Sequence, residues 1–248
     1  VIAVVALGFH RTVAWAGVLL GGTRVILDEG KREASISVKN TGGTPYVVQA
    51  WIDAGDGKNK APFMVTPPLS RLDPGKENKL RILRVPARLP GDRESVFWLN
   101  VKEIPEKSGE ENVLQLAVRS RIKLFYRPSG LAGKALEARE RLRWAVGTDD
   151  SGVTVLRIAN PTPYHVTLTS LNINEGQQAI DADMLAPFSE LVYPLAATET
   201  PQQIQISFST VNDYGGVTAK EMVMVPVADK PVALDAAASG KPAAATGR

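Results

Sequence analysis

The residue types that most often carry enzymatic chemistry are sparse in this sequence. There are two histidines, His10 and His165, and no cysteine, which excludes thiol catalysis, disulfides and zinc–thiolate sites. His165 stands in the alternating run YHVTLT, which favours a residue on a strand face over a catalyst. Counting alone leaves a Ser-His-Asp unit open, but there is no Gly-x-Ser-x-Gly elbow and no phosphate-binding glycine-rich loop. We therefore predict a protein that is not an enzyme and needs no cofactor.

Oxygen-bearing side chains that could bind a cation gather at one place, Asp53, Asp56 and Asn59 around Gly57. They lack the D-x-D-x-D-G spacing and the distal glutamate of a calcium loop. A hairpin turn explains the cluster better, so no metal site is predicted.

Cationic side chains recur along the stretch LQLAVRSRIKLFYRP, residues 114–128, which alternates like a single strand. Alternation places Arg119, Arg121 and Lys123 on one face. The other face carries an apolar row of Leu114, Leu116 and Val118. We expect Arg119 and Arg121 to face solvent and to discourage edge-to-edge pairing.

The totals describe an ordinary globular chain. Its 248 residues exceed the usual domain of about 100–150, so two domains are predicted. With 44% hydrophobic and 22% charged residues, neither disorder nor a fibre is indicated. The net charge of +3 would suit a weak preference for anionic partners but does not argue for nucleic acid.

Two end segments are expected to lie outside the folded domains. Residues 1–16 look like the later part of a secretory signal, with Ala14-Trp15-Ala16 before Gly17, so we predict cleavage after Ala16. A short buried N-terminal strand is the alternative. Residues 229–248 are predicted to be a disordered Ala/Pro-rich tail. No other stretch approaches the roughly 20 apolar residues that span a bilayer, so no stable membrane insertion is expected.

Alternation with period two dominates the rest of the chain. Residues 22–130 read as seven strands with turn signals between them, the spacing of an immunoglobulin-like sandwich. The signal breaks at Ser129-Gly130, where a charged linker is expected. It returns in a second, smaller β domain over residues 137–228.

Five separated motifs then identify a family. They are TR at 23–24, TPP with RLDPG within 66–75, DRESVFWLN at 92–100, IKLFYRP at 122–128, and NPTPY at 160–164 with NDYGG at 212–216. In these motifs and their order the chain resembles the periplasmic chaperones of the chaperone–usher pathway. The resemblance covers about residues 23–227.

This resemblance implies an all-β fold with two immunoglobulin-like sandwiches in an L or boomerang shape. It also implies an ATP-independent periplasmic chaperone that caps pilus or fimbrial subunits and delivers them to an outer-membrane usher. The sequence leaves open whether free copies self-associate through an apolar edge. The short loop PEKSGEEN resembles members that assemble rod-like pili. The alternative function is a secreted two-domain adhesin or carbohydrate-binding module, which would need an exposed aromatic platform; Trp51 and Trp98 are the candidates.

The resemblance also implies roles for particular residues. Arg24 and Lys123 match the cations that anchor the subunit's terminal carboxylate, although each alone could be a solvated strand-end charge. The apolar row matches the strand that such chaperones donate to a subunit. The same alternation would arise if these residues faced the chaperone's own core. Because Lys123 follows Leu114 at an odd interval, either the two sites use different faces or a bulge intervenes.

A third set of residues concerns the join between the domains. Glu94, Arg127 and Asp213 match a family ion network that sets the interdomain angle. We expect these pairs to be exposed, and therefore to contribute under about 1 kcal/mol and to serve orientation more than stability.

Overall fold

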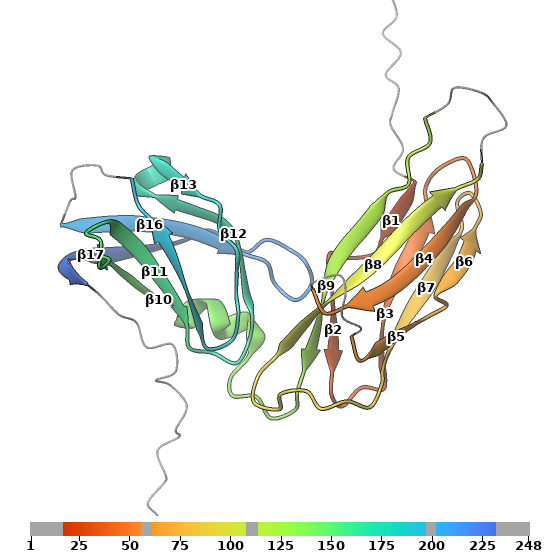
Figure 1. Cartoon of the computed structure of the whole chain (residues 1–248), viewed down its shortest axis with the longest axis horizontal. Coiled ribbons are helices and arrows are strands. Elements are labelled where there is room, and N and C mark those ends of the chain that lie inside the picture. The colour runs from red at the N-terminus through yellow and green to blue at the C-terminus, as the bar shows by residue number, and fades with distance from the viewer. Residues whose placement is uncertain (1–16, 56–60, 108–113, 197–201, 232–248) are drawn as a thin grey trace, which may run out of the picture.

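The computed structural model describes residues 17–55, 61–107, 114–196 and 202–231. Figure 1 shows two β domains that meet at one end and enclose an open angle, so the predicted all-β fold of two sandwiches is confirmed. The predicted signal segment, 1–16, lies outside the described residues. So does most of the predicted tail, although the last strand continues into it as far as Pro231.

Nine strands make up the described part of the first domain, two more than the sequence predicts. They are β1 (Val18–Leu20), β2 (Arg24–Asp28), β3 (Glu33–Asn40), β4 (Tyr46–Asp53), β5 (Phe63–Thr66), β6 (Leu69–Leu72), β7 (Glu77–Arg84), β8 (Ser95–Pro105) and β9 (Arg119–Arg127). One sheet has the order β1-β3-β7-β5 and the other β2-β9-β8-β4-β6.

The chain changes sheet between β1 and β2. β1 pairs with β3, whereas β2 pairs in parallel with β9 in the opposite sheet. The crossing passes through Gly21 and Gly22, and a Cβ at Gly21 would lie 2.3 Å from the Oγ of Ser37. Only glycine allows the backbone to approach the neighbouring strand this closely. β2 therefore begins only at Arg24, and its pairing with β9 begins at Lys123.

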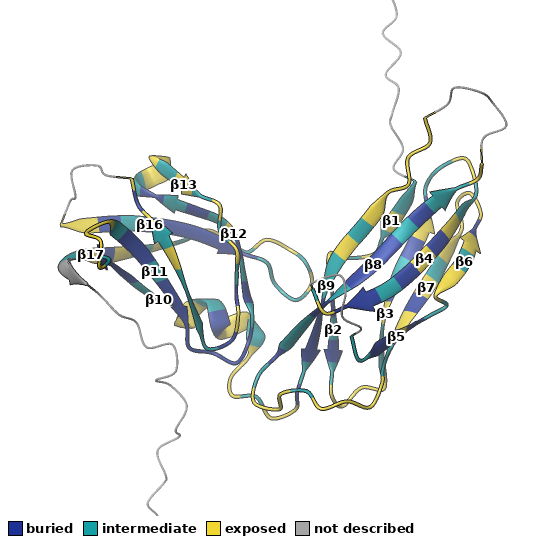
Figure 2. Cartoon of the chain, in the orientation of Figure 1, coloured by how far each residue is buried: buried dark blue, intermediate teal, exposed yellow. Residues whose placement is uncertain are grey.

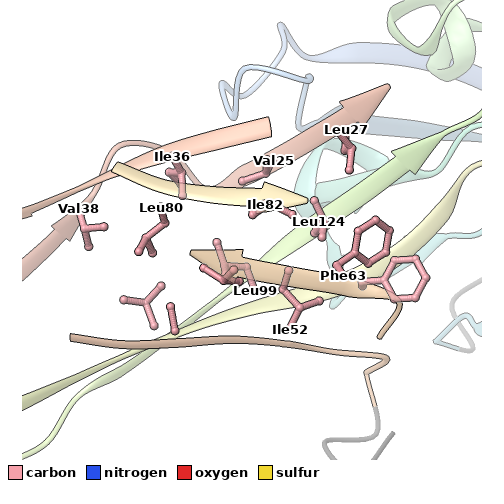
Figure 3. Packing of buried hydrophobic residues seen from close by; sticks show 14 of the residues in the cluster. Val25, Leu27, Ile36, Val38, Ile52, Phe63, Leu80, Ile82, Leu99 and Leu124 are labelled. Atoms are coloured by element: carbon pink, nitrogen blue, oxygen red, sulfur yellow. The ribbon is translucent and has the colours of Figure 1, made fainter. Parts of the chain in front are cut away.

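Alternate residues of both sheets form the core of the first domain. Figure 3 shows side chains from the two sheets filling one layer between them, with Leu80 and Ile82 of β7 fully buried. Leu99 of β8 and Leu124 of β9 are also fully buried. Burial of such side chains contributes about 1.5–3 kcal/mol each, which is why period-two alternation determines the strand faces.

The second domain folds its strands around a separate core. Its elements are η1 (Ala135–Arg141), β10 (Arg143–Thr148), β11 (Thr154–Asn160), β12 (Val166–Ile173), η2 (Asn174–Gly176), β13 (Gln178–Ile180), β14 (Met184–Leu185), β15 (Ser189–Pro194), β16 (Gln203–Thr210) and β17 (Glu221–Pro231). The sheet path is β13-β12-β16-β17-β10-β11-β15, and both halves of this path bury residues in the same core. The sheet therefore folds over on itself as two layers.

The segment between the domains is more structured than the expected linker. It contains η1, a 3-10 helix whose Ala138 is buried in the second core. The hydroxyl of Tyr164 donates to the carbonyl of Gly133 at 3.0 Å, which fixes the segment to the second domain. No helix within the described ranges is long and apolar enough to cross a membrane.

Replacing Leu80 by Ala should reduce the free energy of unfolding of the first domain by about 2–5 kcal/mol, because it leaves a cavity in a closed core. Urea titration followed by tryptophan fluorescence measures the loss. Leu69→Ala is the control, since Leu69 is 58% exposed and should change the value by less than about 0.5 kcal/mol. Equal losses in both variants would contradict the assigned core.

Candidate functional site

β9 is a regular strand with two distinct faces. Its pairing with β8 runs without a register shift from Arg119 opposite Lys102 to Tyr126 opposite Ser95. The pairing extends one residue further, because the amide of Glu103 donates to the carbonyl of Val118 at 2.9 Å. No bulge therefore separates Val118 from Lys123, and the two side chains lie on opposite faces.

The inner face of β9 packs on the core, whereas the apolar residues that precede the strand are exposed. Leu124 and Tyr126 are buried and Ile122 packs against the core. Upstream, the apolar row of Val118, Leu116 and Leu114 is 52%, 68% and 83% exposed. Figure 2 shows this segment as exposed where it leads into β9. The reading in which the row packs into the chain's own core is therefore wrong. The predicted strand is also too long, because β9 begins at Arg119.

One edge of β9 is open over its first residues. β8 pairs with the whole strand, whereas β2 pairs only with residues Lys123–Arg127. The change of sheet at Gly21 and Gly22 is the cause, since the preceding residues pair with β3. Along Arg119–Ile122 the backbone on the β2 side therefore has no paired strand within the described part of the chain. Such an edge is a template for another strand.

On the outer face of β9, Arg119 and Arg121 are exposed, as expected, but both are also tied to a buried carboxylate. Arg121 lies 3.2 Å from Asp53 Oδ1 and donates to the carbonyl of Gly55 at 2.8 Å. Arg119 donates to Asn100 Oδ1 at 2.9 Å, and Asn100 in turn donates to Asp53 Oδ2 at 2.8 Å. Burial would raise the pKa of Asp53, but its bonds to Gly55, Asn100 and Arg121 outweigh this and lower it. These bonds order the beginning of β9, directly after the exposed apolar row.

The same arginines cover the two tryptophans of this sheet. The Arg119 guanidinium lies 5.1 Å from the ring centre of Trp51, and that of Arg121 lies 4.0 Å from the ring centre of Trp98. Both distances suit cation–π contacts. The rings are therefore not a free platform for stacking a sugar.

Arg24 and Lys123 lie side by side as ladder partners of β2 and β9. Burial and the positive charge of Arg24 lower the pKa of Lys123, against the opposing effect of Asp183. Burial also lowers the pKa of Arg24, whose Nη1 donates to the carbonyl of Val211 at 3.2 Å. The described residues provide Lys123 with no ion pair within 4 Å. Two partly buried cations in this position can bind an anion.

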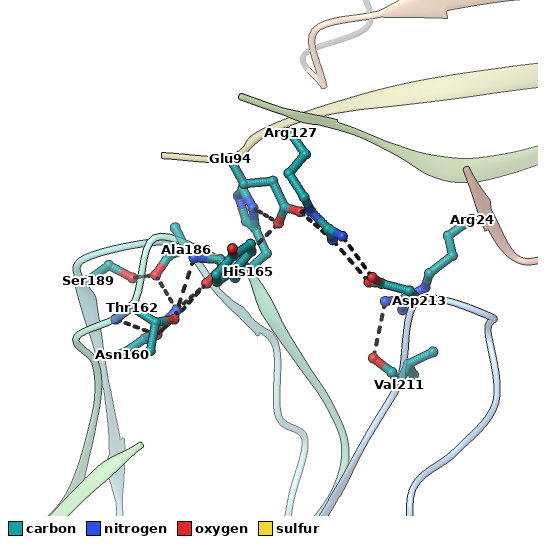
Figure 4. Close-up of polar contacts among 11 residues, drawn as sticks. Arg24, Glu94, Arg127, Asn160, Thr162, His165, Ala186, Ser189, Val211 and Asp213 are labelled. Atoms are coloured by element: carbon teal, nitrogen blue, oxygen red, sulfur yellow. Dashed lines mark hydrogen bonds and ion pairs between the residues drawn. The ribbon is translucent and has the colours of Figure 1, made fainter. Parts of the chain in front are cut away.

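The end of β9 joins the two domains. Arg127 donates from Nε to Glu94 Oε1 at 3.0 Å and from Nη1 to Asp213 Oδ2 at 2.8 Å (Figure 4). The structure thus brings the three predicted residues together. The Glu94 side chain is only 2% exposed and that of Arg127 18%, so the expectation of exposed pairs is wrong. Burial would lower the pKa of Arg127, but its bonds and charge pairs with Asp213 and Glu94 prevail and raise it.

Comparisons with known proteins agree with this geometry. Residues 17–132 match the profile of the pili and flagellar-assembly chaperone, PapD N-terminal domain, and residues 137–222 that of the pili assembly chaperone PapD, C-terminal domain. The chain belongs to the PapD family of pilus-assembly chaperones. This membership confirms the resemblance seen in the sequence motifs.

Individual relatives match along most of their length. The chain is 40% identical over 214 residues to the probable fimbrial chaperone LpfB of Escherichia coli O157:H7, covering 85% of this chain and 89% of LpfB. It is 42% identical over 219 residues to the chaperone protein FimB/FhaD of Bordetella pertussis, covering 83% and 87%.

Two solved structures show the same fold. The E. coli chaperone DraB aligns with a TM-score of 0.71 and 34% identity, covering 84% of this chain and 97% of DraB. The SafB chaperone in complex with the SafA pilin of Salmonella enterica aligns with a TM-score of 0.73 and 30% identity, covering 86% of this chain and 98% of that chain.

The structure adds His165 to the contacts that join the domains of this PapD-family chaperone. Its Nδ1 lies 2.9 Å from Glu94 Oε2, which also accepts the His165 backbone N–H at 2.9 Å. Sequence reasoning took His165 for a strand-face residue, but it lies immediately before β12 with its side chain 4% exposed. Its position directly after the matched NPTPY motif is the signal that could have found it.

Loops of the second domain hold these partners in place. The buried side chain of Asn160 donates to the carbonyls of Tyr164 and Ala186 at 2.6 and 3.0 Å, which fixes the NPTPY loop (Figure 4). Asn212 Oδ1 accepts the amides of Tyr214 and Gly216 at 3.0 Å each and shapes the NDYGG loop around Asp213. Hydrogen bonds within the second domain therefore shape both of the loops that contact the first domain.

A small polar cavity lies where the domains meet, lined in part by Arg24, Phe125, Arg139 and His165. Its volume of about 30 Å³ has room for one water but not for a metabolite. Within the described ranges, no cluster of three or more histidine, aspartate or glutamate residues is placed to hold a metal ion. Residues 56–60, which carry most of the oxygen cluster noted above, lie outside those ranges.

Replacing Arg127 by Ala should release the angle between the domains. Glu94 would keep its bonds from His165 to Oε2, but its buried Oε1 would lose its cationic partner. Breaking a buried ion pair costs up to about 3–5 kcal/mol, so a separated arrangement that lets water reach Glu94 becomes the favoured state. Small-angle X-ray scattering should show a larger radius of gyration and a wider distance distribution, while near-ultraviolet circular dichroism shows both cores intact.

The control is Arg157→Ala, because Arg157 pairs with Glu190 at 2.7 Å inside the second domain and is similarly shielded. This variant should leave the scattering curve unchanged. An Arg127→Ala protein with the wild-type curve would show that the network does not set the angle.

Proposed function

We propose that this chaperone caps a pilus subunit by lending it the open edge of β9 and the apolar row that precedes β9, and holds the subunit's terminal carboxylate between Arg24 and Lys123. Family membership supports the general role of a pilus-subunit chaperone. The observation that carries the finer mechanism is the exposed row Leu114, Leu116 and Val118 beside an unpaired strand edge.

The spacing of the apolar row supports strand donation. Its side chains alternate, so each second residue can enter a pocket of a partner whose own fold lacks one strand. An incomplete subunit would otherwise expose an apolar groove and aggregate. Burying that groove supplies the free energy of capture, so the cycle needs neither nucleotide nor bond-making chemistry.

The position of the anchor determines the direction of the guest strand. A subunit whose last residue lies at Lys123 and whose chain extends towards Arg119 must run parallel to β9. β2 also runs parallel to β9 and begins at the same place, where Arg24 pairs with Lys123. The guest strand would therefore continue the line of β2 along the edge that β2 leaves open.

The charges at this position suit a carboxylate. Arg24 and Lys123 are partly desolvated and repel each other, which lowers the pKa of Lys123. A terminal carboxylate would neutralise them and accept charge-assisted hydrogen bonds, which belong to the strong class. Because the pairing with β8 is regular from Val118 onward, Lys123 on the outer face and Val118 on the inner face can serve one guest strand at the same time.

The setting of this cycle is the periplasm, and the capped subunit would pass to an outer-membrane usher. The secretory features predicted at 1–16 and the family support this proposal. A secreted carbohydrate-binding module is not favoured, because arginines cover both candidate tryptophans.

Lys123→Ala and Arg24→Ala should each abolish recovery of a co-expressed pilus subunit. Losing one charged bond to the carboxylate should weaken binding by about 10- to 100-fold. Co-purification from periplasmic extract measures recovery, and circular dichroism checks folding. Lys102→Ala is the control, since Lys102 lies on β8 opposite Arg119, away from the anchor. Normal yield from both anchor variants would remove the proposed role.

Leu116→Glu should prevent complex formation, because it places a charge in an apolar pocket of the subunit. Met222→Glu is a matched control on β17: Met222 is 69% exposed and Leu116 68%, so neither change should unfold the chaperone. Size-exclusion chromatography of chaperone and subunit measures the outcome. A complex that forms equally well with Leu116→Glu would show that this face is not donated.

A further inference from the structure

Glu103 is a carboxylate buried at the end of the first core. It lies on the inner face of β8 in line with Leu99 and Val101 and is 8% exposed. Its Oε2 accepts the backbone N–H of Val18 at 2.7 Å. Burial raises the pKa of Glu103, and the bond from Val18 only partly opposes this. Within the described residues no cation pairs with it, which is unusual for a buried carboxylate.

Gly17 lies directly against this carboxylate. A Cβ at Gly17 would lie 2.7 Å from Glu103 Oε2 and 2.8 Å from the ring of Tyr46, so no larger residue fits. The carbonyl of Gly17 accepts the amide of Thr41 at 2.9 Å, which holds the residue in place beside β1. The backbone nitrogen of Gly17 is attached to the same Cα as that Cβ would be, so it lies within reach of Glu103.

We propose that proteolytic processing at Gly17 supplies the missing cation. Hydrolysis of the Ala16–Gly17 peptide bond by a signal peptidase consumes one water and yields a carboxylate on Ala16 and a free amine on Gly17. At neutral pH this amine is mostly protonated, since its ordinary pKa is about 7.7–8.0. The neutral amide of the precursor thus becomes an ammonium that forms an ion pair with Glu103.

This ion pair would fasten the start of the mature chain to β8. Glu103 lies opposite Val118, to which it is joined by the 2.9 Å backbone bond, so the pair would sit at the base of the apolar row. A charge-assisted bond at a partly buried site is of the strong kind. Maturation would therefore stabilise the end of the first domain from which the row projects. This inference goes beyond the chaperone cycle and does not depend on it.

The test compares two starting points of the chain in two backgrounds. One protein begins at Gly17 and the other at Ala16, which moves the ammonium by roughly 3.5 Å; each is made with Glu103 and with Glu103→Gln. With Glu103, the Gly17 protein should melt about 2–4 °C higher. With Glu103→Gln, the difference should disappear, while Glu106→Gln, a change at an exposed residue, should preserve it.

A second measurement does not depend on unfolding. Mass spectrometry follows acetylation of the Gly17 amine at neutral pH, and the paired ammonium should react several-fold more slowly than in Glu103→Gln. Three results would overturn the proposal: a mature periplasmic protein that does not begin at Gly17, equal melting of the two starting points, or a difference that persists in Glu103→Gln.

Discussion

The change of sheet made by the first strand is the constraint on which the functional surface depends. Because Gly21 and Gly22 send the chain from β3 across to β9, β2 can pair with β9 only from Lys123 onward. Among the described residues no strand pairs with the remainder of that edge, although β9 belongs to a five-stranded sheet. The same late start of β2 places Arg24 beside Lys123, so the open edge ends at a pair of cations. The change of sheet at Gly21 and Gly22 thus leaves an edge to which a strand can add, and it also places Arg24 beside Lys123 at the end of that edge.

An open strand edge is a hazard unless it is ordered and its exposed surface is small. Here the ordering comes from the outer face of the sheet, where Asp53 binds Arg121 directly and Arg119 through Asn100. The strand is therefore held by polar bonds on the side away from its apolar row. If both faces packed in a core, no side chain would be accessible to a partner. If neither face made bonds, the segment would not be ordered as a strand in the free chaperone. Val118 and Lys123 are separated by an odd number of positions because they lie on opposite faces of the strand, where they have different roles.

The sequence predicts the features that depend on local residue patterns. It does not predict the burial of side chains whose partners lie far away in the chain. Period-two alternation predicts two β domains, and ordered motifs predict the family. Alternation could not tell whether Leu114, Leu116 and Val118 are buried or exposed, because a core strand and a donated strand have the same pattern. It also could not show that Glu94 is covered by His165, or that Asp53 binds Arg121, since these partners lie far apart in the chain.

Because β9 is a regular strand, it holds the open edge, the cationic anchor and the interdomain contact at fixed positions relative to one another. Within one unbroken pairing with β8, the strand carries the open edge at Arg119–Ile122, the cation at Lys123 and the interdomain arginine at Arg127. Because a regular strand advances about 3.3 Å per residue, the anchor lies roughly 13 Å from the contact that sets the domain angle. Phe125 lies between them, with its ring 5.4 Å from that of His165. The second domain is therefore placed by the same strand that would receive the subunit. A change of the interdomain angle would move the second domain relative to Lys123 without deforming β9.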